Sequence, residues 1–283
     1  MAVVIDYKRK IYSTRDLPTL PIIAQKILLL AEDDQAGADK LAKIISSDQS
    51  LSVKVLSLAN SAYYGHRAQV STVKQAIVII GADMLKQIAL SVLVFKALDR
   101  GGKGRTVFWR HSLLAAHASV LIARRCGGMP EDVCFMAGLL HDVGKLILAS
   151  NLEDAYAEVV ALEKQEGCTL QEAERRILDT DHADVGAWMA ERWQLPAQLI
   201  DAIRSHHMEN AGQAPLSRVV TCVRAANMFA TAADSVIEEE PGGFVVLLPS
   251  DILKSLGLDE VKLQDAAREL KLRSKEINQF LAG

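Results

Sequence analysis

A histidine followed directly by an aspartate, His141-Asp142, is the pair of residues in this chain best suited to chemistry. A neutral imidazole and a carboxylate offer the nitrogen and oxygen donors that suit a divalent transition metal. Apolar residues precede the pair in the run Gly138-Leu139-Leu140, which predicts a buried helix that carries the pair. The remaining ligands of such a metal must then come from other helices.

Four more histidines lie on or at the ends of predicted helices, beside apolar residues: His111, His182, His206 and His207. His117 lies six residues after His111, about 120° around a helix, and is not expected to share the site. Lys145 lies four residues after His141 and three after Asp142, so a helix would place all three on one face. A lysine there can bind a phosphate as a point charge.

Each of these residues also has an ordinary structural interpretation. A single histidine on an apolar helix face is more often a hydrogen-bonded core residue than a ligand. His206 and His207 fit a polar helix end near the last carbonyls, and Lys145 fits a solvated surface lysine. The prediction of a metal rests on the number of donors on separate helices. Borderline nitrogen and oxygen donors favour iron, manganese or zinc over magnesium or calcium.

The composition predicts a helical protein with an aliphatic core. Half of the 283 residues are hydrophobic but only 5% are aromatic, and this length is enough for one large domain or two modest ones. A net charge of −3 indicates no basic face, so we expect no direct nucleic-acid binding. The four cysteines form no C-x-x-C pair and are predicted to be reduced thiols.

No apolar leader is seen in the first ten residues, and charged or polar residues interrupt the apolar stretch Ala82 to Leu98. These patterns predict a cytoplasmic protein that does not bind a membrane.

Helical periodicity dominates the chain, so the predicted fold class is all-α, a two-lobed helical bundle. The run Gly101 to Gly104 reads as a linker. It separates an N-terminal helical lobe, residues 1–100, from a second helical lobe, residues 101–232, and residues 233–283 form a C-terminal helical extension. Start signals predict helices opening near Pro130, Thr169, Asp181 and Pro196. The short apolar run 244–248 is the one candidate strand.

The order of the donors resembles the HD superfamily of metal-dependent phosphohydrolases. That superfamily uses a histidine, a His-Asp doublet and a later aspartate, here His111 and His141-Asp142, and Lys145 matches the lysine of the extended H-D-x-G-K form. His182 followed by Gly186, and then His206-His207, are similar to the extra ligands of the branch that hydrolyses cyclic dinucleotides. This resemblance implies a centre for one or two metal ions.

Two departures from the HD pattern weaken the interpretation as an enzyme. The final aspartate is expected on the helix around 219–229, but the matching position is Asn227, whose amide is a neutral and weaker ligand. The loop after His206-His207 lacks the Gly-Tyr-Pro element of the cyclic-dinucleotide enzymes and reads Met-Glu-Asn-Ala-Gly at 208–212.

Motifs in the N-terminal part resemble the HDOD domain, an HD-related output domain of bacterial signalling proteins. These motifs are Leu-Pro-Thr-Leu-Pro at 17–21, Ala-Asn-Ser-Ala-Tyr-Tyr-Gly at 59–65, and the segment 76–81. The resemblance covers about residues 16–207 and implies a regulatory module that binds a signalling protein or a small-molecule or nucleotide ligand.

The alternative is a metal-dependent phosphodiesterase or phosphohydrolase that acts on nucleotides, including cyclic ones. In that case Asp142 and Lys145 would be the catalytic residues. The predicted metal ligands are the same in both interpretations: His111, His141, Asp142, His182, His206, His207 and Asn227.

Overall fold

The structure, a computed structural model, describes residues 6–14, 18–28, 30, 34–60, 70–98, 105–208, 215–235 and 246–282. Every regular element in these ranges is a helix, which confirms the all-α prediction. The Ser-Ala-Tyr-Tyr-Gly part of the N-terminal motif, the glycine linker and most of the loop 208–212 lie outside the described residues. The predicted strand 244–248 lies partly outside them, and its described part, 246–248, has no regular structure.

The chain divides into two compact units. One comprises Met1–Leu17 and Arg110–Ser274, and the other comprises Pro18–Trp109 and Lys275–Gly283. These limits differ from the predicted boundaries at 100/101 and 232/233, because the division falls inside helices. Helix α7 (Arg105–Cys126) and helix α16 (Glu260–Ala282) each contribute residues to both units.

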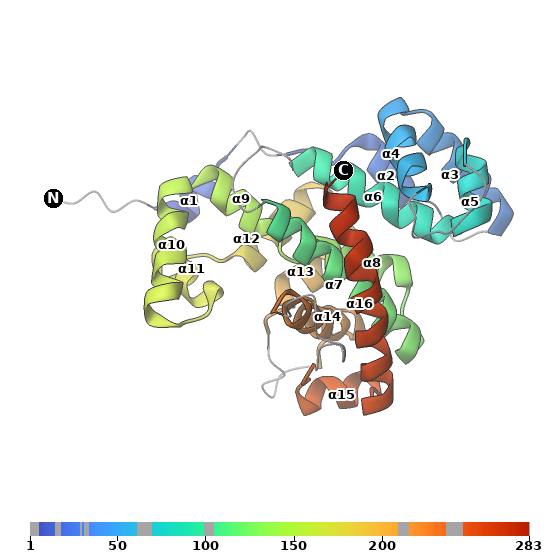
Figure 1. The fold of residues 1–283 in the computed structure, drawn as a ribbon. Helices are drawn as coiled ribbons and strands as arrows, with labels where there is room; N and C mark the ends of the chain where they lie inside the picture. Colours follow the sequence, from blue (N-terminus) through green and yellow to red (C-terminus); the bar gives the residue numbers. More distant parts are fainter. Residues whose placement is uncertain are drawn as a thin grey trace. The chain divides into compact units, whose positions relative to one another are not determined.

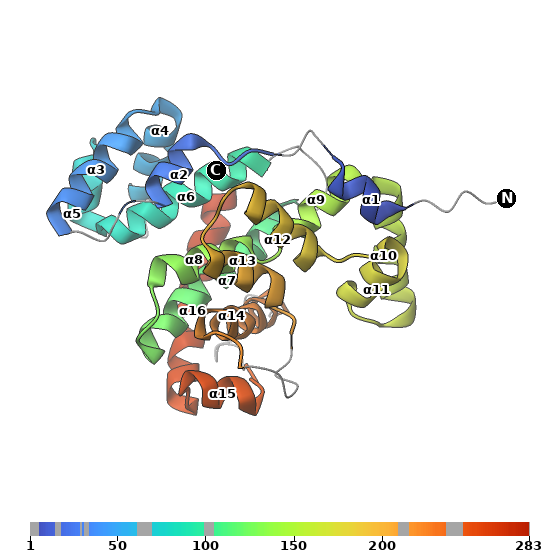
Figure 2. The same cartoon turned by 180° about the vertical axis from the view of Figure 1, so that it is seen from behind.

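In the smaller unit, four helices pack around α6 (Ala82–Leu98), drawn in blue to cyan in Figures 1 and 2. These helices are α2 (Ile22–Leu28), α3 (Asp34–Ser46), α4 (Gln49–Ala59) and α5 (Val73–Ile80). Local signals start and stop them: Thr72 caps α5 with a capping box, and Gly81 ends it with a positive φ of 87°. Most of the buried side chains are aliphatic, among them Ile27, Ile45 and Leu85.

The larger unit contains the helices that carry the predicted ligands. They are α7, α8 (Glu131–Leu140), α9 (Val143–Asn151), α10 (Glu153–Glu166), α11 (Leu170–Leu178), α12 (His182–Arg192), α13 (Ala197–Ser205) and α14 (Arg218–Ser235). The short helix α1 (Tyr7–Tyr12) also belongs to this unit, and α15 (Ser250–Leu256) packs on α14. Figure 1 shows α10 and α11 side by side, and α12 packs against both α9 and α13.

The start signals of these helices act as predicted. Thr169 caps α11 with a capping box, and the Asp181 side chain accepts the Asp184 backbone N–H at the start of α12. Pro130 and Pro196 precede α8 and α13. The core of this unit includes fully buried Phe135 and Phe229 together with many aliphatic side chains.

Within the described ranges, one segment, Glu131–Asn151, is long and apolar enough to cross a membrane, and 72% of its most apolar window is buried inside the protein. This segment comprises α8, α9 and the two residues between them. These helices are covered by other helices of the same unit, α12, α13 and α14 among them.

Candidate metal centre

The His141-Asp142 doublet does not lie within a helix, which corrects the prediction. Helix α8 ends at Leu140 and α9 begins at Val143, so the two residues form the turn between them. The cause is local. Asp142 has φ −99° and ψ 7°, and the His141 ring nitrogen Nδ1 donates to the Gly138 carbonyl at 2.8 Å, where a continuing helix would place a backbone N–H.

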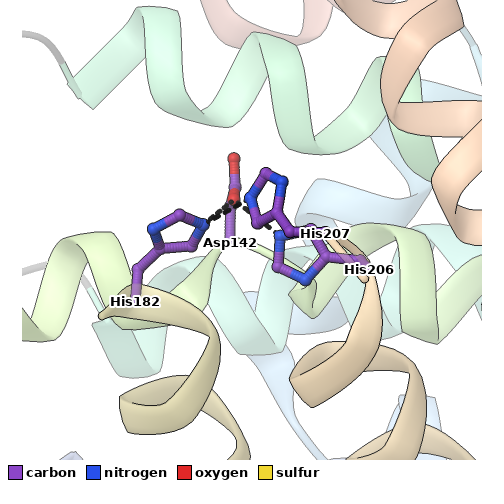
Figure 3. Close-up of side chains that lie close together, drawn as sticks. All are labelled: Asp142, His182, His206 and His207. Atoms are coloured by element: carbon purple, nitrogen blue, oxygen red, sulfur yellow. Dashed lines mark hydrogen bonds and ion pairs between the residues drawn. The ribbon is translucent and has the colours of Figure 1, made fainter. Parts of the chain in front are cut away.

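The Asp142 carboxylate is the centre of the histidine cluster. Its side chain is only 2% exposed. His182 Nε2 and His206 Nε2 lie 3.4 and 3.5 Å from its Oδ1. His141 Nε2 and His111 Nε2 lie 3.3 and 3.6 Å from its Oδ2. Figure 3 shows the Oδ1 side, where His182 approaches from the start of α12 and His206 and His207 from the end of α13.

Two of the other predicted residues complete the cluster. His207 Nε2 lies 2.8 Å from His182 Nε2, and Asn227 Oδ1 on α14 lies 3.0 Å from His111 Nε2. All seven predicted ligands therefore come together in one unit. Donors from Asp142, His182, His206 and His207 lie within 4.8 Å of one another, as do donors from His111, His141 and Asp142. Asp142 belongs to both groups.

Lys145, in the first turn of α9, donates from Nζ to Asp142 Oδ2 at 2.6 Å. Its side chain is 26% exposed, so Lys145 links the buried carboxylate to the protein surface. The predicted proximity of Lys145 to Asp142 is present, although the two residues are not on one continuous helix.

Each of four histidines holds its Nδ1 against an outer partner and turns its Nε2 toward Asp142. His141 Nδ1 donates to the Gly138 carbonyl, and His206 Nδ1 donates to the Ile203 carbonyl at 2.7 Å. His182 Nδ1 lies 2.6 Å from Glu174, and His111 Nδ1 lies 2.9 Å from Asp234. A carbonyl can only accept, so the rings of His141 and His206 carry their proton on Nδ1 and leave a lone pair on Nε2. Such outer partners orient the histidine ligands of metal sites.

Close packing of helices, made possible by glycine, brings the histidines to Asp142. A Cβ on Gly144 would lie 1.9 Å from the His182 carbonyl oxygen, and one on Gly138 would lie 2.7 Å from the Ala115 carbonyl oxygen. Helices α9 and α12, and helices α8 and α7, therefore approach so closely that no side chain fits at these two positions.

Burial and charge determine the protonation of the cluster. Burial tends to raise the pKa of Asp142, but His141 and Lys145 outweigh it and hold that pKa well below its ordinary value. Burial lowers the pKa of His182 far below its usual range, and it lowers the pKa of His207 to about 2. The pKa of His141 is also lowered by burial. The result is an ionised carboxylate beside neutral imidazoles, the forms that bind metals.

The donor distances fit a metal ion. Donors that each lie about 2.1 Å from one ion are about 3.0 Å apart at a right angle and about 3.4 Å apart at a tetrahedral angle. The distances above run from 2.8 to 3.6 Å. In addition, His141 Nε2, Asp142 Oδ1 and His206 Nε2 are buried and have no hydrogen-bond partner among the described residues. Buried polar atoms without partners are rare in folded proteins, and metal ions on the two sides of Asp142 would satisfy all three.

Two carboxylates of the centre were not predicted from the sequence. Glu174 on α11 is fully buried. Its Oε2 accepts a hydrogen bond from the backbone N–H of His182, at 2.8 Å, and another from the ring nitrogen Nδ1 of His182. Tyr156 donates to its other oxygen at 3.1 Å. Burial, opposed by the His182 backbone hydrogen bond, raises the pKa of Glu174 to about 7. Asp234 on α14 is the other, and it contacts both His111 and Arg110.

His117, which was excluded from the site, does lie elsewhere. Its ring packs edge-on against Phe135 at 5.6 Å between centroids. The four cysteines are free thiols, as predicted.

In a comparison with protein families, the HDOD domain model matches residues 17–209. The chain belongs to the HDOD domain family. The resemblance drawn from the N-terminal motifs and the His-Asp doublet is thereby confirmed. The helix that supplies Asn227 and Asp234 lies beyond the matched residues.

Solved structures share the whole fold of this HDOD protein. An HDOD domain protein of unknown function from Geobacter sulfurreducens superposes with a TM-score of 0.78 at 27% identity, covering 98% of this chain and 95% of the other. A proposed signal transduction protein from Marinobacter aquaeolei VT8 has a TM-score of 0.75 at 23% identity, covering 94% and 59%. At that identity the second likeness concerns the fold alone.

Among curated proteins, ribonuclease Y from Deinococcus radiodurans is 27% identical over 152 residues, which is 54% of this chain and 20% of that protein. A protein from Treponema pallidum is 25% identical over 216 residues, 75% of this chain and 42% of its own length. This HDOD chain therefore spans less than half the length of these curated relatives.

Proposed function

We propose that this HDOD protein is a regulatory module whose HD-type centre binds a divalent transition metal, iron, manganese or zinc, with Asp142 as the shared ligand. One observation carries the proposal: each oxygen of a buried carboxylate faces two imidazole Nε2 atoms at 3.3 to 3.6 Å. The outer partners of those rings keep the lone pairs turned inward. A metal bound there would act as a Lewis acid and would polarise an oxygen of a ligand.

The regulatory part of the proposal rests on the family and on Asn227. The amide removes one negative charge from the HD ligand set, which weakens the binding of a cation on the His111 side. A signalling protein or a small-molecule ligand would then bind according to the state of the centre, and no reaction would follow. Membership of the HDOD family, output domains of bacterial signalling proteins, supports this interpretation.

The direct test is the metal content of protein purified without a chelator or a His tag. We expect at least one equivalent of iron, manganese or zinc by elemental analysis, since the donor set is complete on the Oδ1 side. Less than about a tenth of an equivalent would exclude a resident metal at the affinities usual for such sites. Partner binding is tested separately, by pull-down from a bacterial lysate and by ligand-induced shifts in melting temperature.

A second candidate function is metal-dependent phosphodiester hydrolysis. It is favoured by Lys145, whose side chain is partly exposed and whose ammonium group lies at the centre, where it can stabilise charge on a phosphoryl group. It is also supported by the similarity to ribonuclease Y over 54% of this chain. Turnover of cyclic dinucleotides, nucleotides or RNA by protein loaded with manganese or iron would establish it. No turnover by fully loaded protein would leave the regulatory function.

A further inference from the structure

Asp234 is a carboxylate at the edge of the metal centre that belongs to no HD motif. It lies seven residues after Asn227 on α14, and two helical turns bring a side chain back to nearly the same face. Asp234 and Asn227 therefore reach the same histidine. Asn227 Oδ1 lies 3.0 Å from His111 Nε2, and Asp234 Oδ2 lies 2.9 Å from His111 Nδ1.

The two oxygens of Asp234 have different partners. Oδ1 pairs with the Arg110 guanidinium and Oδ2 faces the His111 ring. Arg110 precedes His111 on α7, so one helix supplies both groups and fixes the carboxylate between them. The Asp234 oxygen that faces the ring accepts a hydrogen bond, because its other oxygen is held by the Arg110 guanidinium. It therefore favours the proton of the His111 ring on Nδ1. The lone pair of Nε2 then faces the centre, where the Asn227 amide can turn its NH2 group toward Nε2 when no metal is bound.

We propose that Asp234 is a positioning residue that aims His111 into the centre and fixes the proton of its ring on Nδ1. The inference rests on the proposed metal centre. A carboxylate hydrogen-bonded to the far nitrogen makes an imidazole a stronger donor. The His111 side of Asp142 thus keeps a usable histidine although its last ligand is a neutral amide.

Glu174 holds a histidine in the same way on the other side of the centre. Its Oε2 lies 2.6 Å from His182 Nδ1, much as Asp234 holds His111 Nδ1. His141 and His206 use backbone carbonyls for the same purpose. His111 lies within α7 and His182 begins α12, and each of these two histidines takes a carboxylate instead.

The first measurement is made on metal-free protein, so that it does not depend on the proposed function. Nitrogen-15 chemical shifts of the His111 ring should show a proton on Nδ1 in the wild type. In Asp234→Ala the ring should lose this fixed tautomer, and in Asp234→Asn it should be partly retained because the amide oxygen still accepts. Asp251→Ala is the matched control, since Asp251 on α15 also pairs with an arginine, Arg224, at 3.4 Å.

The second measurement is a Co²⁺ titration followed by visible absorption. Removing an outer partner of a histidine ligand weakens metal binding about 10- to 100-fold, so Asp234→Ala should lower the affinity on the His111 side by that factor. Asp251→Ala should not. In a His111→Ala background the further change Asp234→Ala should have no additional effect, because Asp234 acts through His111.

The outcomes separate the two ideas. If wild-type protein binds no Co²⁺ but Asp234→Ala alters the His111 tautomer, the metal centre is wrong and the positioning role stands. If Co²⁺ binds and Asp234→Ala behaves like Asp251→Ala in both measurements, the positioning role is overturned and the centre stands. Additive losses in the double variant would also overturn it.

Discussion

The two sides of Asp142 differ in whether another group already binds the carboxylate oxygen that a metal ion would use. On the Oδ1 side His182, His206 and His207 supply three imidazoles, and Oδ1 itself has no hydrogen-bond partner within the described part of the chain. On the Oδ2 side His111 and His141 face an oxygen that already accepts a hydrogen bond from the Lys145 ammonium at 2.6 Å. A metal on that side must displace a cation, whereas a metal on the Oδ1 side need not.

One shared carboxylate therefore does not make two equal sites. The Oδ1 side has more donors, all brought by helix ends, and we expect it to bind the first metal ion. The Oδ2 side has one fewer histidine, a neutral amide and a resident ammonium group, and we expect it to bind a second ion weakly. The variants below test this difference in decreasing order of consequence.

Asp142→Asn should abolish metal binding on both sides, because it removes the only anionic oxygens that the two ligand groups share. Elemental analysis should find less than about a tenth of an equivalent, the same threshold that marks the absence of a resident metal. Asp201→Asn, a change of the same kind at an exposed position on α13, should retain the wild-type content. Equal metal content in the two variants would remove Asp142 from the centre.

Gly144→Ala should destabilise the protein and separate His182 from Asp142. The new methyl group would meet the His182 carbonyl at 1.9 Å, so α9 and α12 must move apart, at a cost of about 3 kcal/mol or more in the free energy of unfolding. Gly186→Ala is a milder change at the same helix contact, since a Cβ there would lie 3.0 Å from the Ile203 Cγ2 methyl and 3.2 Å from the Gly144 backbone nitrogen. Urea denaturation of the two variants should show a clearly smaller loss for Gly186→Ala.

His206→Gln and His111→Gln should affect metal binding on different sides of Asp142. The first should weaken the tighter equivalent of Co²⁺ by more than the about 100-fold upper range for an outer partner, since it removes a ligand itself. The second should leave that equivalent unchanged and remove only the weaker one. If His111→Gln weakened the tighter equivalent more than His206→Gln did, the order of the two sides would be reversed.

Lys145→Met should strengthen metal binding on the His111 side. The substitution removes the competing ammonium group while keeping an unbranched chain of similar length. We expect about a tenfold gain in affinity for the second equivalent, corresponding to about 1.4 kcal/mol. Any hydrolysis of phosphodiesters should be lost at the same time, because the positive charge near the scissile phosphate is gone. An unchanged second affinity would show that Lys145 does not compete with the metal.

The weakest effect concerns pH. Burial lowers the pKa of His207 to about 2, whereas an unfolded histidine titrates near 6.5. Below pH 6.5 the unfolded chain therefore binds a proton that the folded protein does not, and the free energy of unfolding falls as the pH drops. In metal-free His207→Gln, urea denaturation between pH 7 and 5 should show a shallower fall. Parallel curves would mean that His207 has the same pKa in the folded and unfolded states.

The sequence was sufficient for the fold class, for most helix starts and for the set of residues that meet at Asp142. Helix caps are local signals, and histidines at helix ends beside apolar residues can be recognised in the sequence alone. The sequence misplaced the doublet because an apolar run before His141 and a lysine after it are equally compatible with a continuous helix. Only the His141 ring bonded to Gly138 shows that the helix ends there.

Glu174 and Asp234 were missed because outer partners are chosen by tertiary packing, and the chain has 35 acidic residues. A weak signal existed for each. Glu174 lies four residues before the buried Leu178, at an apolar position of α11 where a carboxylate is unexpected. Asp234 repeats the face of Asn227 two turns later. Neither signal predicts which histidine the carboxylate contacts.

His141 and His206 have a second role that follows from their place in the fold. Each caps the C-terminal end of its helix, α8 or α13, and each ring substitutes for a backbone N–H on the carbonyl three residues earlier. A metal ion that binds Nε2 acts on the same ring whose Nδ1 caps the helix end. We therefore expect occupancy of the centre to tighten or fray these two helix termini, which amide hydrogen exchange would register. A regulatory module of the kind proposed would then need no turnover to transmit a signal.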